Sequence, residues 1–246
     1  MVQGAEVIVD AFMWFREADM AELRMRLLPD VDVFVVGEAD MTFQGEPKRF
    51  EFPALLEGRL APWADRVVHW PIRIPPGLIR WQVESFQREG LKTAVASVAS
   101  EGDTVVVSDV DEVWGPEMLG PWQDDIHAAR HDFRKMSVYW RWGGAYSWPG
   151  AIGGPWEKMR DHSWQALRDH RWQLESVPSG WHFSWMGEPE DMRVKARSFS
   201  HREYADLPFE DMAEQGLWVD GRLSETDDVP AEWLEWLPVS WLRRVP

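Results

Sequence analysis

The segment Asp103-Thr-Val-Val-Val-Ser-Asp-Val-Asp-Glu-Val-Trp114 decides the fold of this chain. Its apolar run, residues 104–107, is typical of a buried strand. The run leads into Asp109, Asp111 and Glu112, and ligands bind beyond the carboxyl ends of strands in open α/β sheets. Carboxylates crowded at such an edge repel one another unless a cation lies between them. The segment therefore predicts either a site for Mn²⁺ or Mg²⁺ with phosphate oxygens or an acidic, solvated turn.

The sequence before this segment alternates between strand-like and helix-like patterns. Strands are expected at residues 7–15, 31–36 and 67–74, and helices at 18–28, 54–64 and 78–97. Such alternation predicts βαβ units and a mostly parallel sheet. After the segment we expect helices at 116–129, 157–171, 209–215 and 231–237, strands at 133–142 and 181–186, and a flexible glycine-rich region at 143–154.

The composition limits the class of protein. The net charge is −16, which argues against a protein that grips the phosphate backbone of a nucleic-acid duplex. A nucleotide held through a metal is not excluded by this charge. The chain has no cysteine, so disulfides and thiolate sites are absent. No signal peptide and no apolar run long enough for a membrane span is evident, so we expect a soluble, cytoplasmic protein.

Tryptophan is unusually frequent, with 18 residues against 3 tyrosines. Trp140, Trp142, Trp148 and Trp156 lie among glycines. Tryptophan rings fill protein cores and also present flat faces to ligands. These four residues are therefore expected either to be structural or to line a groove that binds a sugar.

Five groups of segments, in this order along the chain, resemble one known family. They are Asp10-Ala-Phe-Met-Trp-Phe-Arg-Glu17 with Glu22-Leu-Arg24; Val31-Asp-Val-Phe-Val-Val-Gly-Glu-Ala39 with Thr42-Phe-Gln-Gly-Glu-Pro-Lys48; Val106-Val-Ser-Asp-Val-Asp-Glu112; Gly180-Trp-His-Phe-Ser-Trp-Met-Gly187 with Lys195 and Ser198-Phe-Ser-His-Arg-Glu203; and Gly216-Leu-Trp-Val-Asp-Gly221. Each group is short, but five in order are specific. Together they resemble glycosyltransferase family 17, the β-1,4-mannosyl-glycoprotein β-1,4-N-acetylglucosaminyltransferase type.

The resemblance implies an α/β, GT-A-like fold whose mostly parallel sheet is flanked by helices, with an elaborated C-terminal part. We expect a single domain over residues 1–246, with a nucleotide-binding part at about 1–115 and an acceptor part at about 116–246. The implied reaction is inverting and metal-dependent, and it moves a sugar from a UDP-sugar, UDP-N-acetylglucosamine, to a hydroxyl. Residues 140–172 do not align with the family, so the resemblance does not identify the acceptor, and a glycan and another hydroxyl compound are both candidates.

The metal would be Mn²⁺ or Mg²⁺, held by the acidic motif. Asp109 and Asp111 lie two residues apart at this strand end, and one is expected to meet ribose or sugar while the other meets the ion. The resemblance favours Asp111 as the ligand and leaves Asp109 as a candidate for either role. It also implies a histidine ligand, since imidazole suits Mn²⁺ in a mixed shell. His182 is the first candidate, and His201 is the alternative.

The nucleotide would lie beside the second strand. Glu38, at its end, is expected to accept hydrogen bonds from uracil or ribose, and Thr42, Gly45 and Lys48 follow in a loop that would cover the nucleotide. Arg88 precedes the acidic motif on a predicted helix and is a candidate phosphate partner. Each of these residues has an ordinary structural alternative, either a surface loop or an exposed helix face.

The catalytic base is the least defined part of the site. A base must take the proton of the acceptor hydroxyl as it attacks. Glu188, Glu190 and Asp191 follow the Gly-Trp-His segment closely, and one of the three is expected to act. A solvated acidic turn explains these carboxylates equally well, and the sequence does not rank them.

Other classes of function remain open from the sequence. Asp-x-Asp after a strand also begins phosphatases of the haloacid dehalogenase type, but there the motif follows the first strand, whereas here about three strands precede it. A non-catalytic carbohydrate-binding or assembly protein on the same fold is the alternative outside enzymes. Transfer of a different sugar, to a small molecule or a modified nucleobase, is the alternative within transferases.

Overall fold

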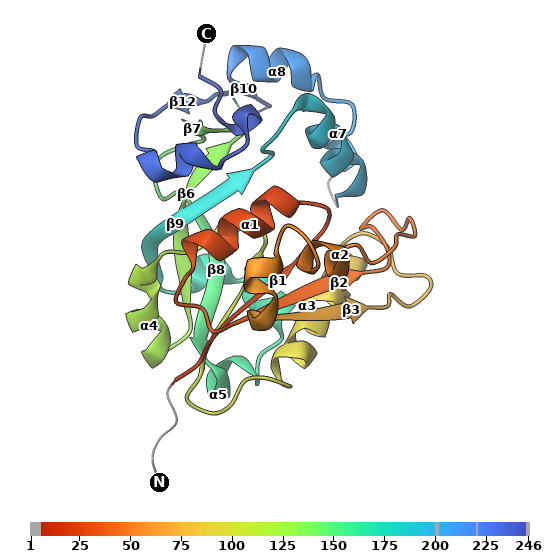
Figure 1. Ribbon diagram of the computed structural model, residues 1–246, viewed down its shortest axis with the longest axis vertical. Helices are drawn as coiled ribbons and strands as arrows, with labels where there is room; N and C mark the ends of the chain where they lie inside the picture. Colours follow the sequence, from red (N-terminus) through yellow and green to blue (C-terminus); the bar gives the residue numbers. More distant parts are fainter. Residues whose placement is uncertain (1–5, 200–201, 220, 245–246) are drawn as a thin grey trace.

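One twisted sheet with helices on both faces forms the body of the molecule (Figure 1). The computed structural model describes residues 6–199, 202–219 and 221–244. From one edge to the other, the strands are β12 (Ser224–Glu225), β7 (Ser137–Arg141), β6 (His127–Lys135), β8 (Trp148–Pro155), β4 (Thr104–Asp109), β1 (Ile8–Met13), β2 (Val33–Ala39) and β3 (Val67–Ile72). In addition, β9 (Ser176–Ser184) pairs with β6 and with the short β5 (Glu112–Val113).

The sheet is parallel in its first half and mixed in its second. β3, β2, β1 and β4 run parallel to one another. β8 then pairs antiparallel with β4, while β9 runs parallel to β6. The α/β class expected from the sequence is confirmed, and the β4–β8 pairing joins the N-terminal and C-terminal halves of the chain in one sheet.

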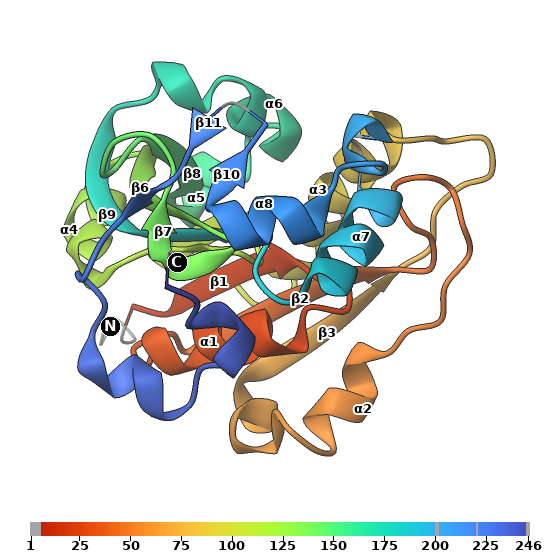
Figure 2. The ribbon, with the colours of Figure 1, turned by 90° about the horizontal axis from the view of Figure 1, so that it is seen from above.

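Helices cover the two faces of the sheet separately (Figure 2). α1 (Ala18–Leu27) and α2 (Phe52–Leu56) pack on one face, and α3 (Trp81–Val95), α5 (Trp156–Met159) and α6 (Trp164–Asp169) pack on the other. Strand alternation explains this division, because neighbouring residues of β2 point to opposite faces. Phe34 joins the core with Leu23 of α1, and Val35 joins the core with Leu91 of α3.

Residues 148–154 of the glycine-rich segment expected to be flexible instead form most of β8. Glycine there permits close packing, because a Cβ on Gly150 would lie 2.2 Å from the ring of His131, and one on Gly153 would lie 2.7 Å from the ring of Trp122. The helix expected at 116–129 is also shorter, since α4 (Leu119–Asp124) ends before β6 begins at His127. Tertiary packing therefore overrides the local signal in both places.

The C-terminal part adds short elements over one end of the sheet (Figure 1). These are α7 (Pro189–Ser198), α8 (Phe209–Gln215), the hairpin of β10 (Leu217–Trp218) with β11 (Gly221–Arg222), and the 3₁₀ helices Ala231–Glu235 and Val239–Trp241. The expected helix at 209–215 is present. α7 was not predicted, and the helix expected at 157–171 is divided between α5 and α6.

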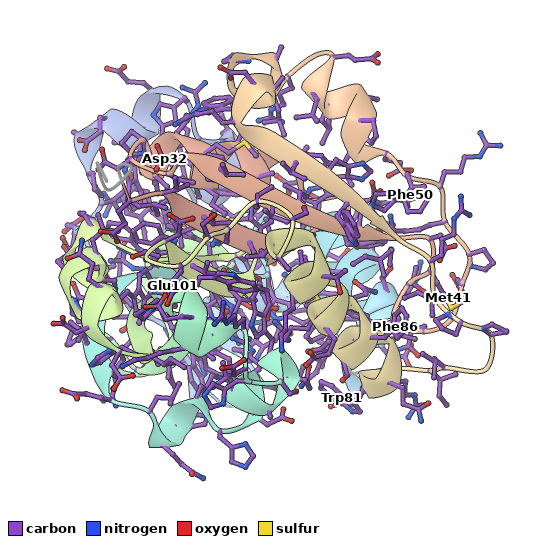
Figure 3. All side chains as sticks on the ribbon, turned by 90° about the horizontal axis from the view of Figure 1, so that it is seen from below. Asp32, Met41, Phe50, Trp81, Phe86 and Glu101 are labelled. Carbon is purple, nitrogen blue, oxygen red and sulfur yellow. The ribbon has the colours of Figure 1, made fainter. Side chains whose placement is uncertain are left out.

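The outer surface of α3 carries two exposed rings, Trp81 and Phe86 (Figure 3). Figure 3 also shows Met41 on the loop that follows β2. Within the described ranges, every helix is too short or too polar to cross a membrane.

A buried histidine of β6, His131, links this strand to its neighbours β8 and β9. The Nδ1 atom of His131 lies 2.8 Å from the carbonyl oxygen of Ser179, and its Nε2 atom accepts from the backbone N–H of Ala151 at 3.0 Å. An imidazole that accepts at Nε2 and donates at Nδ1 is neutral. Burial lowers the pKa of His131 to about 4, so protonation opposes the folded state.

We expect this histidine to give an acid-dependent loss of stability. His131 is protonated near pH 6.5 in the unfolded chain and near pH 4 in the folded chain. The unfolded state therefore binds more protons between these pH values, and the free energy of unfolding falls as pH falls. Between pH 7.5 and 4.5 the loss from this residue is about 2 to 3 kcal/mol. Urea unfolding of wild type and His131→Gln at both pH values measures it. Equal pH slopes in the two proteins would contradict the assignment.

Candidate active site

A cavity of about 290 Å³ opens where the parallel strands β1, β2 and β4 end. Its walls come from segments far apart in the sequence, and their charged or hydrogen-bonding residues are Glu17, Thr42, Lys48, Glu84, Gln87, Asp109, Asp111, Lys135, Arg168, His182, Ser184, Lys195, Ser198 and Tyr204. This is the edge at which open α/β sheets bind ligands. The cavity therefore lies where the acidic motif was predicted to act.

Asp111 lies at the centre of the cavity wall with His182 and Lys195. One carboxylate oxygen, Oδ2, accepts from Lys195 Nζ at 2.8 Å, and the other, Oδ1, lies 3.6 Å from His182 Nε2. The pairing of β5 with β9 sets this arrangement, because it places residues 112 and 182 opposite each other. Burial alone would raise the pKa of Asp111, but Lys195 and His182 outweigh it and hold the pKa well below its usual value.

Asp109 has different partners from Asp111. Arg88 donates to its Oδ1 at 3.1 Å and Arg168 to its Oδ2 at 2.6 Å. Burial opposes ionisation, yet the guanidiniums of Arg168 and Arg88 outweigh it and lower the pKa of Asp109. Two protein cations already neutralise this carboxylate, which argues against the prediction that Asp109 binds the metal. Arg88 itself is a partner of Asp109 and does not line the cavity.

Glu112 is wholly buried beneath the cavity. It accepts from Trp148 Nε1 at 2.8 Å and from Arg168 Nη1 at 2.7 Å, so it connects the acidic motif to β8 and α6. It does not line the cavity. Glu112 therefore positions Arg168 and Trp148 rather than meeting a ligand.

Arg24 of α1 holds the backbone of the acidic motif from below. Its guanidinium pairs with the buried Asp10 at 2.6 Å and donates to Ser108 Oγ at 2.7 Å. It also donates to the carbonyl oxygens of Asp109 at 3.2 Å and Glu112 at 2.7 Å. One side chain thus fixes the strand end and the turn that present Asp109 and Asp111.

The predicted nucleotide residues divide into two groups. Thr42 and Lys48 line the cavity, whereas Glu38 and Gly45 do not. Glu38 is fully buried and accepts from Lys48 Nζ and from the backbone N–H groups of Glu51 and Phe52. It therefore anchors the loop after β2, which argues against the prediction that its carboxylate meets uracil or ribose.

Gly45 forms a turn in this loop, with a φ of 92° that favours glycine. The residue before this glycine is Gln44, whose side-chain amide donates to the carbonyl oxygen of Phe199 at the end of α7. The rings of Phe43 and Phe199 lie 6.3 Å apart. The loop after β2 and the end of α7 thus meet beside the cavity, to which both Phe43 and Phe199 contribute.

Aromatic rings form the wall on the side of β6, β7 and β8. The His182 ring stacks on Phe133 with centroids 4.3 Å apart, and Trp142 and Trp148 contact the same phenylalanine. Of the four tryptophans singled out in the sequence, Trp142 and Trp148 line the cavity. Trp140 and Trp156 are buried in the core clusters.

The three carboxylates predicted to include the base lie at the start of α7. Glu188 and Asp191 form a capping box there, and Glu190 pairs with Arg193 at 3.1 Å. None of the three lines the cavity, which argues against the prediction. Among the described residues, the lining carboxylates outside the acidic motif are Glu17 and Glu84. His201 lies outside the described residues.

Several residues of the site were not assigned a role from the sequence. Lys195, Arg24 and Glu17 lie within or beside the segments that resemble the family, and this position is what could have indicated a role for them. Arg168 falls in residues 140–172, where no motif was recognised. Its role depends on α6 packing against α3, which brings Arg168 to Asp109 at the end of β4 and which no local pattern predicts.

Asp111 and His182 fit a divalent cation. A carboxylate oxygen and an imidazole nitrogen suit Mn²⁺, and Mg²⁺ also binds through one or two carboxylates with substrate phosphates and water. The Nδ1 atom of His182 is buried and has no hydrogen-bond partner among the described residues. Three-residue metal clusters are absent from the described part of the chain. The chain would therefore supply two ligands, and a bound diphosphate and water would supply the others.

Residues 2–215 match the family model of glycosyltransferase family 17. The chain belongs to this family and is therefore a glycosyltransferase. Family membership and the α/β sheet together bear out the fold class that the resemblance implied. No curated protein sequence matches the chain.

Three solved structures are similar to the chain at low identity. The galactosyltransferase LgtC in complex with donor and acceptor sugar analogues is 12% identical over 93% of this chain and 99% of that one, with a TM-score of 0.37. The inositol-1-phosphate CTP transferase of T. maritima is 11% identical over 83% and 99%, with a TM-score of 0.39. The glycosyltransferase GlyE of Streptococcus pneumoniae TIGR4 is 13% identical over 85% of this chain, with a TM-score of 0.34, and the chain spans 53% of its length.

Proposed function

We propose that this glycosyltransferase is metal-dependent and inverting, and that it moves N-acetylglucosamine from UDP-N-acetylglucosamine to a hydroxyl of a glycan or other acceptor. The observation that carries the proposal is the meeting of Asp111, His182 and Lys195 in the cavity beyond the parallel strands. Asp111 and His182 would hold Mn²⁺ or Mg²⁺. The bound ion would neutralise negative charge on the departing diphosphate.

In this reaction an acceptor oxygen forms a bond to the anomeric carbon while the bond from that carbon to the phosphate oxygen breaks. UDP leaves with the electron pair, and the hydroxyl proton passes to a base. Among the described residues, Glu17 and Glu84 are the lining carboxylates outside the acidic motif, and the proposed base is one of these two. Burial raises the pKa of Glu17, with Lys195 opposing, and a raised pKa favours proton acceptance.

The other lining residues have separate proposed roles. Asp109, fixed by Arg88 and Arg168, would accept a hydroxyl of the donor sugar or ribose. The faces of Trp142 and Trp148 would stack on the acceptor, since aromatic rings pair with the apolar faces of sugars. These side chains border one cavity, so donor and acceptor would share it.

The test of donor binding is a thermal shift. UDP with MnCl₂, at 100 times its dissociation constant, is expected to add about 2.7 kcal/mol of stability. For a chain of this size that raises Tm by about 5 to 10 °C. UDP with EDTA should give a smaller shift. The absence of any shift with UDP and Mn²⁺ would overturn the proposal.

The donor sugar is tested in the same buffer by the release of UDP from several UDP-sugars, with water as acceptor. UDP-N-acetylglucosamine should be hydrolysed fastest. A large preference for another UDP-sugar would replace the donor and leave the class of reaction unchanged. In the thermal-shift measurement, ADP with Mn²⁺ serves as the control for the nucleotide base.

A further inference from the structure

Lys195 lies between two carboxylates in the cavity wall. Its Nζ atom donates to Asp111 Oδ2 and to Glu17 Oε1, each at 2.8 Å. The side chain is 21% exposed and borders the cavity. Two carboxylates at 2.8 Å favour the charged form of the amine, so Lys195 meets a ligand as an ammonium.

The ammonium of Lys195 pairs with the carboxylate of Asp111, which also faces His182. An ion held by Asp111 and His182 without nucleotide would share the Asp111 carboxylate with Lys195, whose Nζ atom lies 2.8 Å from Oδ2, and the two positive charges would repel. A diphosphate removes the conflict, because its oxygens can pair with the ammonium and the ion together. Lys195 therefore opposes the free cation and favours the cation–diphosphate pair.

We infer that Lys195 binds the diphosphate of the donor and makes divalent-cation binding at Asp111 conditional on that diphosphate. The inference rests on the proposed function, because it takes a nucleotide diphosphate as the ligand of this cavity. Glu17 is a positioning residue here, since it holds the ammonium at the cavity wall beside Asp111. Cation and nucleotide then favour each other's binding reciprocally.

The experiment measures Mn²⁺ binding by the electron paramagnetic resonance of the free ion. Wild type and Lys195→Met are each titrated alone, with saturating UDP, and with saturating uridine, which carries no phosphate. In wild type, UDP should tighten Mn²⁺ binding by about tenfold or more, and uridine should not. In Lys195→Met, Mn²⁺ alone should bind about tenfold more tightly than in wild type, and the tightening by UDP should largely vanish.

Two further variants serve as controls. Lys158→Met removes an exposed lysine that pairs with Asp125 outside the cavity, and it should behave as wild type in every titration. Lys195→Arg keeps the positive charge and should keep most of the coupling. If Lys195→Met does not melt cooperatively, Glu17→Gln/Lys195→Met removes the ammonium together with one of the carboxylates that it neutralises, and the same result is expected.

Several results overturn the inference. They are unchanged Mn²⁺ affinity in Lys195→Met, unchanged coupling to UDP in that variant, and coupling to uridine in wild type. Each of these can occur while wild type binds Mn²⁺ and UDP together, so the proposed function survives them. Failure of wild type to bind Mn²⁺ even with UDP present would instead overturn the proposed function, and this inference with it.

Discussion

Arg24→Met is expected to lower the free energy of unfolding by about 3–5 kcal/mol, because it leaves a buried carboxylate without its cation. The side chains of Arg24 and Asp10 have no exposed surface, and their two hydrogen bonds are each 2.6 Å long. After the substitution, Trp114 Nε1 is the remaining partner of Asp10 in the described hydrogen bonds, at 3.1 Å. A fall in Tm of about 6 to 20 °C is expected and can be followed by circular dichroism.

The same helix supplies a matched control. Arg26 is partly exposed and pairs with Glu22 one turn away, so Arg26→Met should cost about 1 kcal/mol or less. The double variant Asp10→Leu/Arg24→Met removes both buried charges and should recover part of the loss. Equal effects of Arg24→Met and Arg26→Met would show that the buried pair does not have this role.

The first half of the fold could be predicted from the sequence because its signals are local. β1, α1, β2, β3 and β4 each show apolar patterns of the right period, and the structure has all of them near the expected positions. The second half depends on contacts between distant residues. β8 contains three glycines, and neighbours such as the rings of His131 and Trp122 pack so closely against it that a Cβ would clash there.

The site shows the same limit. Asp111 and His182 were paired from motif context, and the structure places them 3.6 Å apart. Their roles remain predictions. Glu38 was assigned to the nucleotide from its place at a strand end, but its backbone partners at residues 51 and 52 come from a loop whose path the sequence does not indicate. Three cations pair with Asp109 and Asp111, namely Arg88, Arg168 and Lys195, and they lie on three separate helices that converge only in the folded chain.

Asp111→Asn is expected to slow the release of UDP from UDP-N-acetylglucosamine by about 10³-fold or more. The amide has the size of the carboxylate and keeps an oxygen for Lys195, but it loses the charge that would hold the cation. A metal contributes several kcal/mol to the transition state, and about 4 kcal/mol corresponds to 10³ in rate. Asp125→Asn, at an exposed carboxylate paired with Lys158, is the control and should leave the rate unchanged. A loss of less than tenfold in Asp111→Asn would contradict the assignment.

The neighbouring carboxylate separates a role in catalysis from a role in folding. Glu112 is buried among Arg168 and Trp148 and does not reach the cavity, so Glu112→Gln should lower Tm by disrupting a buried charged pair. Asp111→Asn should lower Tm less than Glu112→Gln does, because the amide oxygen can still accept from Lys195 and Lys195 keeps Glu17 as its partner. Asp111→Asn should nevertheless lose the part of the Tm increase with UDP that depends on Mn²⁺. If Asp111→Asn instead destabilised the chain as much as Glu112→Gln, its lost activity would reflect folding, and the cation site would have to be placed elsewhere.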